Sequence, residues 1–79
     1  MKARIVVTLK TGVLDPQGKA IEAALKSFGI ASIEGVRQGK VFDIEVAAAD
    51  RAGAEATLKT ACEKLLANTV VENYAIEIA

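Results

Sequence analysis

Strict alternation of apolar and acidic residues in the middle of the chain limits what it can fold into. Phe42, Ile44 and Val46 alternate with Asp43 and Glu45. A strand here would turn an apolar face to one side and an acidic face to the other. Such a strand belongs in an antiparallel sheet with one covered face. The segment therefore predicts a half-buried sheet at the centre of the fold.

Besides residues 41–47, which contain this alternation, three further segments have strand patterns. Residues 2–9 alternate and are β-branched, and residues 70–78 form the predicted last strand. Residues 32–37 and 41–47 are predicted as two short strands around Gln38 and Gly39, where the glycine would supply the positive φ of a tight hairpin turn.

Two helices are predicted between these strands. Asp15 followed by Pro16 is a helix-start signal, and Gly29 is a C-terminal stop. Asp50 is expected to cap a second helix that runs to about Ala67. Apolar residues at helical spacing are expected to face the sheet: Ile21, Ala24, Leu25 and Phe28 in the first helix, and Ala54, Leu58, Ala61, Cys62 and Leu65 in the second.

The order β-α-β-β-α-β is the ferredoxin-like arrangement. We therefore expect one α+β domain over residues 1–79, with two helices on one face of an antiparallel sheet. A chain this short buries only about 60–65% of its unfolded surface, and association is a common remedy. The open sheet face is only partly polar and indicates a partner; the apolar residues expected on it are Val6, Val41, Ala47 and Ala75.

Charge and composition exclude several classes. Ten basic and ten acidic residues cancel, which argues against nucleic-acid and anionic-membrane partners. No apolar stretch approaches the roughly 20 residues of a membrane span, and no signal-peptide pattern precedes the first strand. The single cysteine excludes an intrachain disulfide framework. We expect a cytoplasmic protein.

The chain lacks the residues that most catalysis requires. It has no histidine, and Cys62 lies on an apolar stripe, where a structural thiol is the ordinary interpretation. Asp43 and Glu45 would bind a hard cation only with added ligands. The carboxylates of Glu22, Glu55 and Glu63 are interpreted as solvated surface. We expect no catalytic residue, no metal site and no cofactor in this chain.

Three blocks carry a family resemblance. They are residues 7–20, which include the run Leu-Asp-Pro-Gln-Gly, residues 36–40, and residues 62–77, which open with Cys-Glu-Lys-Leu-Leu-Ala-Asn. Together, and in this order, they resemble the PurS subunits of phosphoribosylformylglycinamidine synthase over essentially the whole chain.

The resemblance implies a role in de novo purine biosynthesis. In split forms of this ATP-dependent ligase complex, a PurQ-type glutaminase subunit releases ammonia and a small PurL-type synthetase subunit uses it with ATP and Mg. PurS-type chains bridge the two as an accessory subunit without chemistry of their own. We therefore expect both subunits as partners, together with a second copy of this chain, in a homodimer or a dimer of dimers.

Capping and turn chemistry leave Gln17, Arg37 and Lys40 unexplained. Through the resemblance, nine residues are candidates for subunit contacts: Asp15, Pro16, Gln17, Gly18, Arg37, Lys40, Asn68, Glu72 and Tyr74. Two other functions stay open. An ACT-like regulatory domain that binds a small molecule shares the element order, and a small oligomeric enzyme would have to rely on carboxylates.

Overall fold

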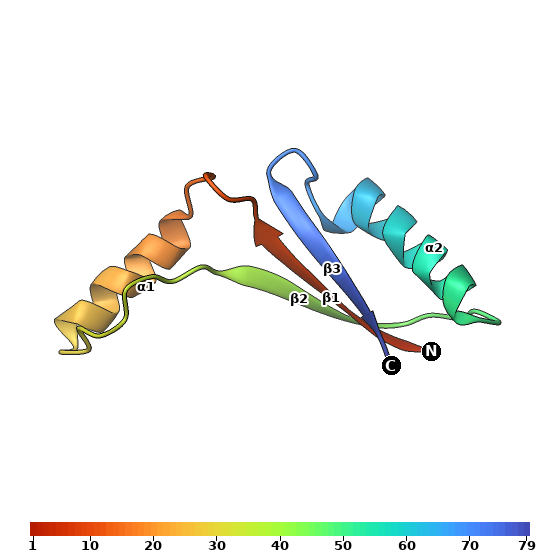
Figure 1. Cartoon of the computed structure of the whole chain (residues 1–79), viewed down its shortest axis with the longest axis horizontal. Helices are drawn as coiled ribbons and strands as arrows, with labels where there is room; N and C mark the ends of the chain where they lie inside the picture. The colour runs from red at the N-terminus through yellow and green to blue at the C-terminus, as the bar shows by residue number, and fades with distance from the viewer.

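The computed structural model describes all residues, Met1–Ala79. Its elements in chain order are β1 (Lys2–Leu9), α1 (Pro16–Ser27), β2 (Gly39–Glu45), α2 (Arg51–Ala61), the π-helical turn η1 (Cys62–Leu66) and β3 (Glu72–Ile78). The α+β class and the antiparallel sheet are confirmed. The placement of α1 is not the one that the sequence predicted (Figure 1).

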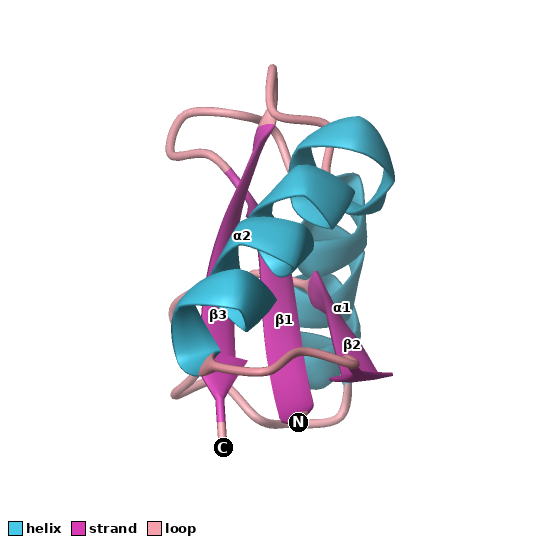
Figure 2. Cartoon of the chain, turned by 90° about the vertical axis from the view of Figure 1, so that its right-hand side faces the viewer, coloured by secondary structure: helices cyan, strands magenta, loops and turns pink.

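The sheet has the order β2-β1-β3, with β1 antiparallel to both neighbours. Ile5 lies opposite Phe42 on one side and opposite Ile76 on the other. Helix α2 packs over this face, in front of β3 and β1 in Figure 2, and leaves Ile5 and Leu58 0% and 2% exposed. The core beneath α2 consists of Ala3, Ile5, Val7, Val46, Ala54, Leu58, Cys62 and Ala67.

Helix α1 lies beyond the end of the sheet instead of beside α2 (Figure 1). The chain is accordingly elongated, with a radius of gyration of 16.0 Å and extents of 51 × 25 × 14 Å. A compact chain of this length has a radius of gyration of about 12 Å. The expectation that both helices cover one sheet face is therefore met by α2 alone.

The predicted strand at residues 32–37 is not formed. The chain returns along α1 and passes straight through Gly39 into β2, without the predicted turn (Figure 1). Positive φ angles occur only at Gly12 and Gly29. A Cβ at Gly39 would lie 2.6 Å from the carbonyl oxygen of Val7. Glycine is thus required for close strand pairing, and not for a reversal of the chain.

The predicted helix starts are confirmed. The Asp15 and Asp50 carboxylates accept hydrogen bonds from the N–H groups of Gly18 and Gly53, at 2.9 and 2.7 Å. Gly29 ends α1 in the left-handed region, with φ of 83°.

The end of the second helix differs from the prediction. In η1 the N–H of Ala67 donates to the carbonyl of Cys62, five residues back, at 3.0 Å. This wider turn breaks the 3.6-residue period of the apolar stripe. Leu65, predicted to face the sheet, is 84% exposed, whereas Leu66 and Ala67 pack on the core.

Candidate functional site

Residues 10–38, here called the arm, carry four of the eight large hydrophobic side chains that the fold leaves exposed. The arm contains the β1–α1 loop, α1 and the segment that returns to β2 (Figure 1). On it Phe28 is 78% exposed, Ile21 39% and Ile30 42%. The stripe predicted for the first helix therefore exists, but it does not face the sheet: Leu25 is half-buried, and Ile21, Ala24 and Phe28 are exposed. An amphipathic helix with a bare apolar face is typical of an interaction surface.

Asp15 lies at the base of the arm and is only 6% exposed. One carboxylate oxygen accepts from the N–H of Gly18 at 2.9 Å, and the other accepts from the N–H of Gln38 at 2.8 Å. These two bonds, with that of Gln38 the stronger influence, hold the pKa of Asp15 below its ordinary value. The helix cap thus also ties α1 to a residue 23 positions away.

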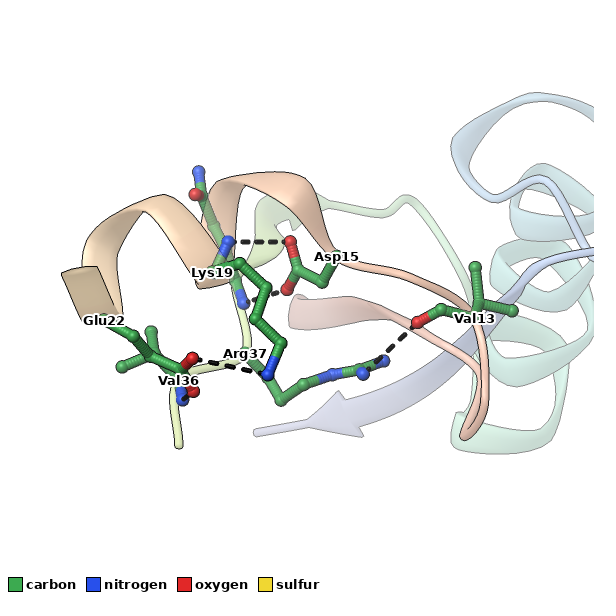
Figure 3. Close-up of polar contacts among 8 residues, drawn as sticks. Val13, Asp15, Lys19, Glu22, Val36 and Arg37 are labelled. Atoms are coloured by element: carbon green, nitrogen blue, oxygen red, sulfur yellow. Dashed lines mark hydrogen bonds and ion pairs between the residues drawn. The ribbon is translucent and has the colours of Figure 1, made fainter. Parts of the chain in front are cut away.

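Glu22 makes a second tie, about two turns of α1 beyond Asp15 (Figure 3). Its Oε1 accepts from the N–H of Val36 at 2.8 Å, and its Oε2 lies 3.4 Å from the Lys19 ammonium. The Val36 N–H, followed by the charge of Lys19, lowers the pKa of Glu22. Gly18 permits this approach, because a Cβ there would lie 2.4 Å from the Val36 carbonyl oxygen.

Arg37 joins the returning segment to the end of β1. Its guanidinium donates to the carbonyl oxygens of Leu9 at 3.1 Å and Lys10 at 3.3 Å. It also donates to the carbonyl oxygen of Val13 at 3.4 Å (Figure 3). A planar donor group satisfies several carbonyls of a loop at once. The predicted interface residue Arg37 therefore has a structural role in this chain.

Four of the nine predicted interface residues meet in one open groove where the arm joins the sheet. Asp15, Gln17, Lys40 and Glu72 line this groove. The Lys40 ammonium and the Glu72 carboxylate are 3.6 Å apart. Since Lys40 faces Val7 and Glu72 faces Leu9 in the strand register, the ion pair spans the central strand. The groove is a polar surface at the base of the arm.

Of the other candidates, Pro16, Gly18 and Arg37 belong to the arm, Asn68 precedes β3, and Tyr74 lies within β3. Pro16 is exposed, while Gly18 is buried against the returning segment. The Asn68 side chain accepts from the Val70 N–H at 3.2 Å, and the Tyr74 hydroxyl donates to Glu63 at 3.1 Å. Desolvation, then the Glu63 carboxylate, raises the pKa of Tyr74. The interface role of all nine residues stays a prediction.

Sequence reasoning missed the partners of these residues. Glu22 and Glu63, interpreted as solvated surface, accept hydrogen bonds from Val36 and Tyr74. Gln38, interpreted as part of a turn, donates its N–H to Asp15. Bonds between residues that are 11 to 23 positions apart leave no periodic pattern in one sequence.

Three further observations concern a possible nucleophile, metal binding and membrane insertion. Cys62 is fully buried, and burial raises the pKa of its thiol, which keeps it a poor nucleophile. No three His, Cys, Asp or Glu side chains gather in a way that would hold a metal ion. None of the helices has the length and apolar character needed to traverse a bilayer.

Comparisons with known proteins agree on one family. The family model of PurS, phosphoribosylformylglycinamidine (FGAM) synthase, matches residues 2–79. The PurS subunit of Synechocystis is 47% identical over 95% of this chain and 75% of its own length. The Bacillus subtilis PurS structure has a TM-score of 0.87 at 43% identity, covering 96% of this chain and 94% of its own. A chain in the structure of PurLQS from Thermotoga maritima has a TM-score of 0.89 at 37% identity, covering 96% and 93%.

Proposed function

Because the chain belongs to the PurS family, the subunits of phosphoribosylformylglycinamidine synthase in purine biosynthesis, we propose that it bridges the glutaminase and synthetase subunits of that enzyme. In this role it performs no chemistry itself. It holds the exit of a PurQ-type glutaminase against the entrance of a small PurL-type synthetase. The synthetase subunit binds the ATP and Mg, and the complex works in the cytoplasm.

The exposed apolar arm is the observation that carries this proposal. A soluble chain of 79 residues with a Phe side chain 78% exposed on a projecting helix requires a partner to cover it. The likeness to the chain in PurLQS extends over 96% of this chain, which includes the arm. That likeness supports PurL- and PurQ-type subunits as the larger partners.

A second copy of the chain is the partner that we propose for the arm. Helix α2 lies over β3 and β1, and Phe42 and Ile44 of β2 stay partly exposed on the same face. This is the place that the first helix was predicted to occupy. In the proposed homodimer the arm of one chain covers this surface on the other, an exchange of identical elements. Size-exclusion chromatography with light scattering tests it through the mass in solution.

Ammonia transfer gives the bridge its chemical purpose. Ammonia released into water at neutral pH is mostly protonated, and the ammonium ion has no free electron pair with which to attack an electrophile. A subunit that brings the two active sites together shortens the path on which this protonation occurs. It thereby increases the yield of glutamine nitrogen without contributing a catalytic residue.

The decisive experiment is a synthase assay with purified glutaminase and synthetase subunits, with and without this chain. Glutamine and ammonium serve in turn as nitrogen source. The proposal expects glutamine-dependent turnover to require the chain and ammonium-dependent turnover to proceed without it. Equal glutamine-dependent turnover in both mixtures would refute the bridge and return attention to a regulatory domain that binds a small molecule.

A further inference from the structure

We propose that the carboxylates of Asp15 and Glu22 form a clamp that holds the arm open for exchange with a second copy. The inference rests on the homodimer proposed above and names the device that favours exchange over closure within one chain. The clamp consists of these two side chains and the backbone N–H groups of Val36 and Gln38 that they bind.

The two carboxylates bind N–H groups that lie close together in the returning segment. Val36 and Gln38 are two residues apart, so in an extended segment their N–H groups point to the same side. Both point to α1, at 2.8 Å from a carboxylate oxygen. In the hairpin predicted from the sequence, residues 32–37 would pair with residues 41–47, and the chain would have to reverse direction immediately after Gln38. Since Asp15 fixes Gln38 to the start of α1, the segment continues straight into β2 instead.

Helix α1 and the returning segment also fit closely against each other. Gly18 lies so close to Val36 that a Cβ would be 2.4 Å from its carbonyl oxygen. The alternate residue Arg37 donates on to the carbonyls of Leu9 and Val13, which fixes the same segment to the end of β1. Helix, returning segment and strand end are therefore linked at one junction.

The clamp preorganises the arm for association with a second copy. An arm that is already directed away from its own sheet loses little conformational freedom when a second copy accepts it, and this loss is a main cost of association. Loosening the junction would let the arm sample many directions, including closure on its own sheet. The clamp should therefore act on the affinity of the homodimer more than on helix formation.

The structure offers matched controls for both carboxylates. Asp50 caps α2 through the Gly53 N–H and has no second backbone partner, so Asp50→Asn removes a cap charge without touching the arm. In Asp15→Asn the single amide oxygen can still cap Gly18, but the amide N–H₂ meets the Gln38 N–H, donor against donor. Glu22→Ala removes the other tie and retains a strong helix former; Glu55→Ala, on α2, is its control.

The test measures the homodimer dissociation constant of the full chain by sedimentation over a dilution series. Charge-assisted bonds of this kind lead us to expect a rise of about tenfold or more for Asp15→Asn and for Glu22→Ala. Both controls should stay within about threefold of wild type. Far-UV circular dichroism verifies that each variant is folded. If Asp15→Asn does not fold, Glu22→Ala alone tests the clamp.

The outcomes separate the two proposals. A wild-type chain that is monomeric at all concentrations overturns the homodimer, and the clamp with it. A wild-type dimer whose affinity is unchanged by both arm variants overturns the clamp alone. Equal weakening by Asp15→Asn and Asp50→Asn also overturns it, because the effect would then be general helix capping.

An independent readout follows the direction of the arm. Ser27 at the end of α1 and Thr57 on α2 are exposed, and native Cys62 is buried, so cysteines at the first two positions can be spin-labelled selectively. The doubly labelled chain is measured at concentrations below the homodimer dissociation constant, so that docking on a second copy does not set the direction of the arm. The clamp predicts a narrow distance distribution in the wild-type background and a broader one with Asp15→Asn. Equally narrow distributions in both overturn it.

Discussion

Truncation of Phe28 to alanine should dissociate the proposed homodimer and leave each chain folded. Phe28 is 78% exposed at the end of α1, so its removal opens no cavity in the core of the single chain. A buried phenylalanine hides about 150–250 Å². The exposed 78% therefore corresponds to roughly 120–190 Å², or about 3–5 kcal/mol at 25 cal/mol per Å².

Alanine retains part of that area, so we take about 2 kcal/mol per arm. Two arms are exchanged in a symmetric dimer, which gives about 4 kcal/mol and roughly a thousandfold increase in the dissociation constant. The assay is sedimentation equilibrium, with circular dichroism to verify helix content. Leu65→Ala is the control, because Leu65 is similarly exposed at 84% but lies in η1, away from the arm.

Two results would refute this reasoning. If Phe28→Ala changes the dissociation constant by less than about threefold, the arm is not in the interface. If Leu65→Ala weakens the dimer as strongly, loss of any exposed apolar side chain is sufficient, and the arm has no special role. The magnitude thus tests the location of the interface and not only its existence.

Three further predictions concern the sheet domain and the clamp. Leu58→Ala should lower the free energy of unfolding in urea by about 2–5 kcal/mol, because Leu58 is 2% exposed beneath α2; a change under 1 kcal/mol would contradict this core assignment. The lowered pKa values of Asp15 and Glu22 mean that their stabilisation is complete above the ordinary values of 3.8 and 4.5 and is lost as the pH falls through the folded-state values. Wild type should therefore lose dimer affinity below about pH 4.5, and a D15N/E22A variant should show a flatter profile; identical profiles would contradict the assignment. Cys62 should resist iodoacetamide at pH 8 until urea unfolds the chain, and rapid native labelling would show that its burial is transient.

Local patterns predicted the parts of the fold that local forces determine. The helix starts at Asp15 and Asp50 follow from side-chain capping, which involves residues only three positions apart. The alternation around Phe42 and Ile44 predicted which side of β2 faces the core. Leu65 marks the limit of this reasoning, since one extra residue in the η1 turn changes which side chains face inward.

The three resemblance blocks predicted the family. They did not predict how the site residues are arranged in space. Asp15, Gln17, Lys40 and Glu72 were selected as separate positions, and the fold brings them into one groove. Glu22 carries no signal of its own, because its partner, the Val36 N–H, is a backbone group present at nearly every residue. Leu25, expected from the sequence to face the sheet, lies half-buried on the arm, so Leu25→Ala should act on the proposed dimer.

The arm could not be predicted because Gly39 is compatible with two structures. Glycine permits a left-handed turn, and it also permits close approach of two strands. The alternation in β2 is the same in either case. The second applies here, where a Cβ would meet the Val7 carbonyl and Asp15 holds Gln38.

A closed chain and a chain with an exchanged arm would bury the same stripe on the same kind of surface. They differ in whether that surface belongs to the same molecule, and apolar periodicity carries no information on that point. The choice depends on the free energy of the junction at the base of the arm and on protein concentration. A few side-chain bonds to Val36 and Gln38 can therefore decide the assembly of a chain whose fold class is determined by its apolar pattern.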